Sequence, residues 1–316
     1  MPRIIKTNLN CEKGDKMTKE NFQLNTALVE LSRNKSKILN EKGYYDEEQD
    51  QKIIKEYYQS IDFNQSDKTA ITQSLHQLIS NTHENQLPYN SETRNLLYSR
   101  VDLHTDGTLK SIYSGNKQDP EQTIREDHEA EQNREKALAK LTMSIFENDQ
   151  ARQKAVADIE REFMYNCEHV VPQSWFDKDN PMRGDLHHLF TCEQVCNSSR
   201  SNYPYYDFED YTPQMEIEAI RPECGKYEDS KFEPESGKGV VARATLYFLL
   251  RYPGEINRYN SKDIKMLIHW HHEHEVSIYE KHRNKEIHQI QKNRNPLIDF
   301  PQHIDKIDFM TLIKAQ

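Results

Sequence analysis

Residues 166–176 read NCEHVVPQSWF and set an acid beside a histidine at the start of a short β-prone run. Adjacent side chains of a regular strand leave opposite faces, so Glu168 and His169 are poorly placed to chelate one metal ion together. They can instead flank a phosphate, with Glu168 on a hard cation and His169 directed at an attacking water. Histidine suits a general base because its unperturbed pKa is about 6.5. The pair alone is more typical of a surface or buried histidine than of a catalytic one, so the assignment depends on the rest of the chain.

A second motif, GDLHHLFTCEQVCNSSRSNYPY at residues 184–205, supplies an amide and an arginine. The carboxylate of Glu168 and the amide carbonyl of Asn197 are oxygen ligands, which suit Mg²⁺ better than Zn²⁺. We expect Asn197 to open a helical turn, which puts Arg200 three residues on at the same side. An arginine in that position can hold a phosphate with two N–H groups.

Several further motifs follow in order along the chain, and together they resemble the bacterial endonuclease I family, non-specific nucleases of the ββα-metal (His-Me finger) group. The resemblance covers roughly residues 50–303. It rests on the two motifs above, on YYQSI, LHQLISNTHENQLPY and SIYSG before them, and on FEPESGKGVVARATLYFLLRY, WHHEHEVSIYEKHRN and QKNRNPLIDFP after them.

The resemblance implies roles for the residues that match the family motifs. It makes His169 the general base, and it makes Glu168 and Asn197 the protein ligands of one divalent ion, Mg²⁺ or in its place Mn²⁺ or Ca²⁺. The expected reaction is hydrolysis of DNA with little sequence preference and with 5′-phosphate products, and RNA is left open as a further substrate.

Supporting positions also follow from the resemblance. Arg183, in the loop between the two motifs, is a second candidate for the phosphate contact. His187 and His188 are expected to orient the metal finger by hydrogen bonding. Arg294 and Asn295 are expected to lock the C-terminal segment against the core.

The fold predicted is α+β, a helix-rich single domain built around the ββα-metal core. Residues 1–45 are interpreted as a polar N-terminal extension, and residues 46–316 as the nuclease domain. The charged stretch at about 116–162 is longer than the family pattern leads us to expect, so we interpret it as a helical insertion. Within the domain, Ile71, Leu75 and Leu78 recur at helical spacing, and residues 238–252 form a mostly apolar helix. Ser261, and Ser277 with Glu280, are expected to cap two later helices.

Composition bounds the remaining alternatives. The formal net charge is −10, which opposes a nucleic-acid partner only weakly because binding needs a local cationic field. The sequence shows no run of about 18 apolar residues, so no membrane association is expected. It also shows no apolar signal segment, which predicts the cytoplasm, or export if a signal was removed. The oligomeric state is left open.

Five cysteines are present, and Cys167, Cys192, Cys196 and Cys224 lie in or near the motifs. Reduced thiols are the first expectation. A structural zinc site with four cysteine ligands and, in an exported protein, a disulfide stay open as alternatives.

Two other functions remain open. A catalytically silent member of the same fold would bind nucleic acid or protein, although the intact Glu168, His169 and Asn197 argue against it. A zinc hydrolase using the histidines at 269–274 fits poorly, because neither metalloprotease spacing is present there.

Overall fold

The computed structural model describes residues 9–142, 148–211 and 224–313, so residues 1–8 of the expected extension and 143–147 of the expected insertion lie outside it. This part of the chain is helix-rich α+β, as predicted. Its helices are α1 (Leu9–Ile38), α2 (Glu41–Tyr44), α3 (Glu47–Tyr57), α4 (Lys68–Asn81), α5 (Ser91–Leu96), α6 (Pro120–Thr142), α7 (Asp149–Glu162), α8 (Gln194–Arg200), α9 (Lys238–Arg251), α10 (Ser261–Glu273), α11 (Ile278–Gln291) and α12 (Pro296–Asp299).

In the described ranges the strands are short and pair within three separate antiparallel ribbons. They are β1 (Leu109–Lys110) with β2 (Lys117–Gln118), β3 (Cys167–His169) with β4 (Leu189–Thr191), and β5 (Gly225–Glu228) with β6 (Lys231–Pro234). None of the helices in the described ranges is both long and apolar enough to cross a membrane.

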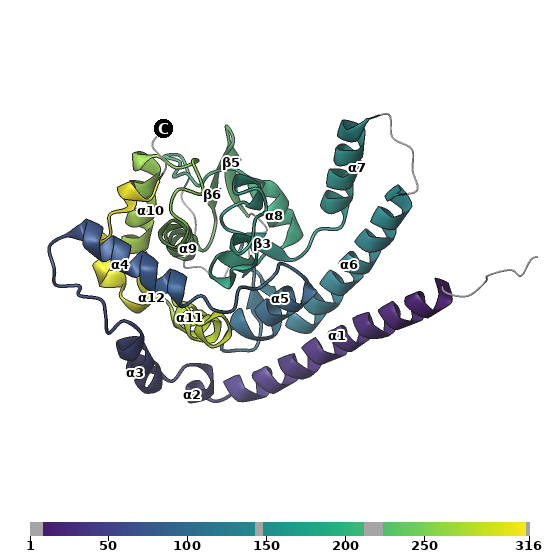
Figure 1. The fold of residues 1–316 in the computed structure, drawn as a ribbon, viewed down its shortest axis with the longest axis horizontal. Helices are drawn as coiled ribbons and strands as arrows, with labels where there is room; N and C mark the ends of the chain where they lie inside the picture. Colours follow the sequence, from purple (N-terminus) through teal and green to yellow (C-terminus); the bar gives the residue numbers. More distant parts are fainter. Residues whose placement is uncertain (1–8, 143–147, 212–223, 314–316) are drawn as a thin grey trace, which may run out of the picture.

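Helix α9 is the centre of the larger hydrophobic core, and its sequence explains why. Its residues are apolar around nearly the whole circumference, so it must be covered on all sides. Contacts from α4, α10 and α12 cover it, and Figure 1 shows α9 end-on among them. The predicted stripe of α4 is confirmed, since Ile71 and Leu75 are fully buried against this core and Leu78 packs at its edge.

Helix ends follow local sequence signals. Ser277 and Glu280 form the predicted capping box of α11. The prediction that Ser261 caps α10 is wrong, because Asn260 takes that position and closes a capping box with Asp263. An asparagine immediately before the serine offers a carbonyl that accepts from two backbone N–H groups, Lys262 and Asp263.

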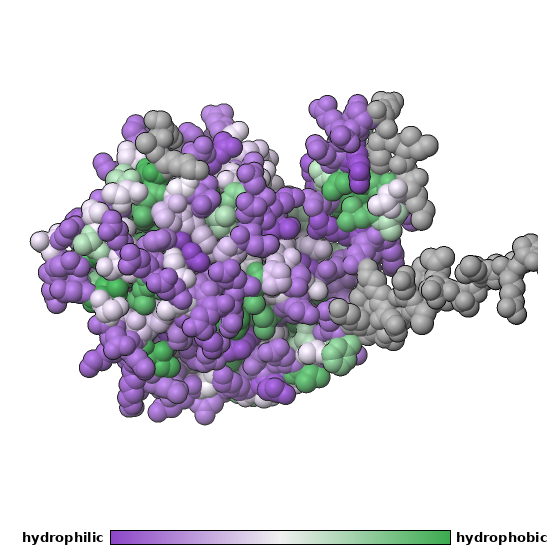
Figure 2. All heavy atoms as spheres, in the orientation of Figure 1, coloured by the Kyte–Doolittle hydropathy of each residue, from purple (hydrophilic) through white to green (hydrophobic). Residues whose placement is uncertain are grey.

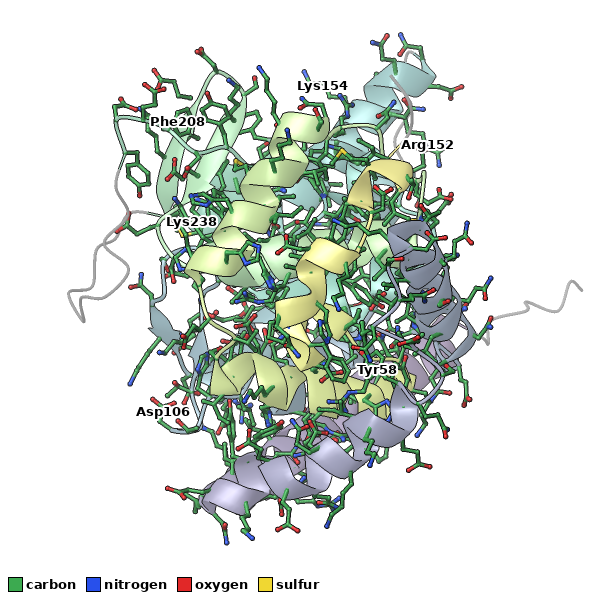
Figure 3. All side chains as sticks on the ribbon, turned by 90° about the vertical axis from the view of Figure 1, so that its left-hand side faces the viewer. Tyr58, Asp106, Arg152, Lys154, Phe208 and Lys238 are labelled. Carbon is green, nitrogen blue, oxygen red and sulfur yellow. A yellow bond between two sulfur atoms is a disulfide. The ribbon has the colours of Figure 1, made fainter. Side chains whose placement is uncertain are left out.

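The C-terminal segment is locked to the N-terminal helices by a buried ion pair network. Arg294 is fully buried and binds Asp50 of α3 and Asp299 of α12 through its guanidinium. Tyr58, which follows α3 and is labelled in Figure 3, donates to the same Asp299 at 3.0 Å. Asn295 caps α12 through its side chain. The expected lock at Arg294 and Asn295 is confirmed.

The stretch interpreted as an extension takes part in a second core. Ala27, Leu31 and Ile38 of α1 are buried in a cluster with Leu97 and Leu189. Residues 27–45 therefore pack as part of the domain, because α1 is amphipathic over its last turns despite its polar composition.

The stretch interpreted as an insertion contains a pair of helices, α6 and α7, that stand beside the body of the molecule (Figure 1). In α6 the first two turns are anchored, with Thr123, Ile124 and Asp127 buried, whereas α7 has no buried residue. Figure 2 shows an open notch between the α7 arm and the rest of the molecule. The hairpin is thus fixed at its base and exposed along its arm.

Candidate active site

One strand ribbon and the helix that follows it carry three of the predicted site residues. In β3 and β4, Glu168 lies opposite Phe190 and His169 lies opposite Leu189. Asn197 lies in the middle of α8 rather than at its start, and its Nδ2 donates to the Cys167 carbonyl at 3.0 Å. This bond ties α8 to β3 and leaves the amide oxygen of Asn197 available as an acceptor.

Glu168 is 4% exposed, and polar neighbours hold its carboxylate from the interior side. The hydroxyl of Tyr113 donates to Oε1 at 2.6 Å, and the guanidinium Nε of Arg200 lies 3.4 Å from the same oxygen. Burial raises the pKa of Glu168 to about 7, although Arg200 and Tyr113 act in the opposite direction. The carboxyl group of Glu168 therefore takes up a proton near neutral pH.

His169 is 5% exposed, and its ring is fixed by one hydrogen bond. Its Nε2 lies 3.0 Å from the carbonyl oxygen of Arg183. A carbonyl only accepts, so Nε2 carries the hydrogen and Nδ1 keeps a lone pair. Burial, and then the neighbouring His188, hold the pKa of His169 well below its usual value. The imidazole is consequently neutral at pH 7, with one nitrogen free to take a proton.

The two candidate arginines occupy different environments. Arg183 lines the same pocket as Glu168, His169 and Asn197, with its Nε held by Gln173 at 2.9 Å and its guanidinium over the ring of Tyr89.

Arg200 is fully buried. Its Nη2 donates to the Val170 carbonyl at 2.8 Å, and its Nε faces Glu168. The predicted phosphate contact does not fit this position, because the i+3 spacing that put Arg200 beside Asn197 turns it toward the core instead of the pocket.

His187 and His188 lie in a 3₁₀ turn, Leu186–His188, that leads into β4. His188 binds the Met182 carbonyl through Nε2 at 2.6 Å, and its ring stands 5.6 Å from that of His169. The ring of His187 packs on Tyr247. Both side chains are buried beside the β3–β4 ribbon.

Asp185 anchors this turn. Its carboxylate is fully buried and accepts hydrogen bonds from Tyr247 and Tyr252, each at 3.0 Å, and from Gln291 at 2.9 Å. Asp185 thereby joins β4 to α9 and α11, and it sets the position from which the Arg183 carbonyl reaches His169.

The cysteines differ from the first expectation. Cys196 and Cys224 form a disulfide that links α8 to the start of β5, with Cα atoms 5.1 Å apart, so reduced thiols are wrong for this pair. Cys167 and Cys192 are free and buried. Within the described ranges no three histidine, cysteine, aspartate or glutamate side chains converge as a metal site. The four-cysteine zinc site and the zinc site at 269–274 are therefore not formed there.

The pocket that joins these residues has a volume of about 300 Å³. Glu168 and Asn197 each present a side-chain oxygen to the pocket that could ligate a metal ion. Such a pair of oxygens suits a hard divalent cation that keeps several waters. The α6–α7 hairpin forms part of its wall through Arg134 and Glu160.

A profile of the family described as Endonuclease I matches residues 68–302, which is most of the chain. The chain belongs to the endonuclease I family. The matched range contains the pocket residues from Tyr89 to Asn202, and it excludes α1 to α3.

Curated relatives agree with this family. An extracellular ribonuclease of Bacillus subtilis (strain 168) is 31% identical over 162 residues, which cover 45% of this chain and 54% of the relative. An extracellular deoxyribonuclease of Aeromonas hydrophila is 29% identical over 159 residues, covering 42% of this chain and 64% of the relative. A periplasmic deoxyribonuclease of the same organism is 28% identical over 122 residues, covering 38% and 49%. The chain thus spans about half to two thirds of the length of these relatives.

Two residues of this endonuclease I site escaped the sequence analysis. Tyr113, in the SIYSG motif, bonds to Glu168, and Asp185, in the GDLHH motif, organises the turn before β4. Both lie inside motifs that carry the family resemblance, SIYSG and GDLHH, and that position was the available signal.

Proposed function

We propose that the chain is a metal-dependent endonuclease that hydrolyses phosphodiester bonds of DNA, and of RNA as well, with little sequence preference. The observation that carries the proposal is the neutral His169, anchored at Nε2, in one pocket with Glu168, Asn197 and Arg183. The names of the relatives, deoxyribonucleases and ribonucleases, support a nucleic-acid substrate. In this proposal β3, β4 and α8 form the ββα-metal finger.

In the reaction, Nδ1 of His169 takes a proton from a water whose oxygen attacks the phosphorus. The bond from phosphorus to the 3′ oxygen breaks, and that oxygen leaves with a proton from solvent, which gives 5′-phosphate and 3′-hydroxyl ends. Arg183 donates to the non-bridging oxygens of the scissile phosphate. One Mg²⁺, or Mn²⁺ or Ca²⁺ in its place, held by Glu168 and Asn197, would stabilise charge on the phosphate and the leaving oxygen.

Arg200 has a positioning role in this scheme. Its guanidinium lies behind Glu168 and favours the ionised carboxylate, which is the form that binds a cation. It does not contact the substrate.

We also infer that the protein works in an oxidising compartment. The disulfide between Cys196 and Cys224 supports this, since such bonds persist outside the reducing cytosol. The relatives named as extracellular or periplasmic point the same way.

The test is cleavage of supercoiled plasmid with Mg²⁺, with chelator, and in a His169→Ala variant. We expect nicking that needs the metal and falls about 10²- to 10⁴-fold in the variant. His269→Ala, at an exposed histidine of α10, is the matched control and should cleave normally. The cut ends should accept label from polynucleotide kinase only after phosphatase treatment.

A folded wild-type protein that cleaves neither plasmid nor RNA would favour the alternative of a catalytically silent binder. Full activity in His169→Ala would refute the assignment of the base.

A further inference from the structure

Three charged side chains outside the catalytic group share the wall of the pocket. They are Arg134 of α6, Glu160 of α7, and Lys178 in the turn that follows Trp175. Two of them belong to the inserted hairpin and the third to the body of the domain. The hairpin is therefore part of the site and not only an appendage.

Glu160 joins the two cations. Its Oε1 accepts from Nη2 of Arg134 at 2.5 Å, and its Oε2 accepts from Nζ of Lys178 at 3.0 Å. The three side chains are 20%, 31% and 44% exposed for Arg134, Glu160 and Lys178 respectively, so solvent and ligands can reach them. One carboxylate thus uses both of its oxygens to bridge two elements across the pocket wall.

Two other ion pairs of the hairpin stay within one helix. Arg125 pairs with Glu121, and Arg161 pairs with Asp158, each about one turn away on the same helix and largely exposed. These four residues do not line the pocket. Such local pairs are typical of a solvated helix face, whereas the contacts of Glu160 bring together groups from three segments.

Two cations that converge on a carboxylate also fit a phosphodiester. Both anions present two oxygens that share one negative charge, and arginine and lysine are the usual protein partners of phosphate. A strand whose scissile phosphate lies at His169 and Arg183 carries further phosphates along the same wall. If the carboxylate of Glu160 stayed between the two cations, it would repel the phosphates of that nucleic-acid strand.

We propose that Arg134 and Lys178 form a second phosphate subsite of the nucleic-acid groove, which Glu160 occupies in the free protein and yields to a backbone phosphate. This inference rests on the proposed function. Glu160 then acts as an internal competitor of the substrate, and the α6–α7 hairpin contributes a contact to strand binding.

The experiment measures binding of a short labelled DNA strand by fluorescence anisotropy at several salt concentrations. It uses the His169→Ala background with Ca²⁺, so that cleavage does not interfere. The variants are Arg134→Gln, Lys178→Gln and Glu160→Gln. Arg161→Gln is the matched control, because it removes a cation from α7 outside the pocket.

We expect Arg134→Gln and Lys178→Gln each to weaken binding about 3- to 10-fold and to reduce the salt dependence by about one counterion. Glu160→Gln should tighten binding about 3-fold, and this gain should shrink when Arg134→Gln is present as well. Arg161→Gln should leave the dissociation constant unchanged.

The sign of the Glu160→Gln effect decides the matter. If that variant weakens binding as Arg134→Gln does, the three residues are a structural clamp and the subsite is wrong. An Arg134→Gln variant that matches Arg161→Gln also overturns it. In either case the nuclease function is retained if the wild-type protein cleaves plasmid. If the wild-type protein neither cleaves plasmid nor binds the DNA strand, both the function and the subsite are refuted.

Discussion

The β3–β4 ribbon with α8 and the α6–α7 hairpin line the same pocket, yet different forces hold them. Glu168, His169 and Asp185 are at most 5% exposed and are bound by side chains and carbonyls of the core. The arm helix α7 has no buried residue, and ion pairs at Glu160 connect it to its neighbours.

These two kinds of contact make one side of the pocket rigid and the other side adaptable. A buried polar group left without its partner costs about 1–3 kcal/mol, so a buried network has one favourable arrangement. An exposed ion pair contributes about 0–1 kcal/mol, so a wall held by such pairs can change its partners. The proposed reacting groups lie in the buried network. The surface proposed to contact the rest of the nucleic-acid strand is held by exposed ion pairs.

The largest effect is expected at the buried centre. Asp185→Ala removes an acceptor from Tyr247, Tyr252 and Gln291, and it should lower the free energy of unfolding by about 4 kcal/mol. Asp158→Ala, at an exposed acid of α7, should change it by less than about 0.5 kcal/mol. Urea unfolding measures both. Similar losses in the two variants would remove the contrast between the regions.

Next is the disulfide that holds α8. Cys196→Ser with Cys224→Ser frees a loop closed over 28 residues, and should cost about 3–4 kcal/mol of stability. Unfolding in urea with and without reductant measures it: wild type should lose stability on reduction, and the double variant should not respond. A wild type that is indifferent to reductant would show that packing alone holds α8.

The core histidines give the molecule a pH dependence. Burial lowers the pKa of His187 and of His271 to about 4. Between pH 6.5 and 4 the unfolded chain then binds more protons than the folded one, so stability is lost as pH falls through this window, by up to about 1.4 kcal/mol per pH unit for each histidine. Glu168, with a pKa raised to about 7, opposes this trend as a single group.

Urea midpoints at a series of pH values test this dependence. His187→Gln should flatten the slope between about pH 6.5 and about pH 4. A slope that is unchanged in His187→Gln, or one of opposite sign in wild type, would contradict the prediction.

The smallest effect is expected on the outer face of the hairpin. Arg125→Ala breaks an i,i+4 pair with Glu121 whose side chains are 52% and 54% exposed, so stability should fall by less than about 0.5 kcal/mol. Plasmid cleavage should stay at the wild-type rate. A loss above about 1 kcal/mol would mean that the hairpin is integrated as tightly as the β3–β4 ribbon.

Several features could be read from the chain because they depend on neighbours in sequence. The stripe of α4, the apolar α9 and the capping box of α11 follow from spacing within one or two turns. The motifs also located the pocket, since Glu168, His169, Asn197 and Arg183 all line it. The helical spacing did not predict the environment of Arg200. A separation of three residues from Asn197 fixes the side of the helix on which Arg200 lies, but not what that side faces.

The amino-acid sequence was sufficient to predict the family, the main helices, and Glu168, His169, Asn197 and Arg183 as residues of the site. Three features could be seen only in the folded protein: Arg200 is buried behind Glu168, Cys196 pairs with Cys224, and α1 completes a core. The folded protein also shows that Glu160 bridges the hairpin to Lys178. The reason is physical: propensity and capping act over a few residues, whereas burial, pKa shifts and ion-pair partners depend on segments that meet only when the chain is folded.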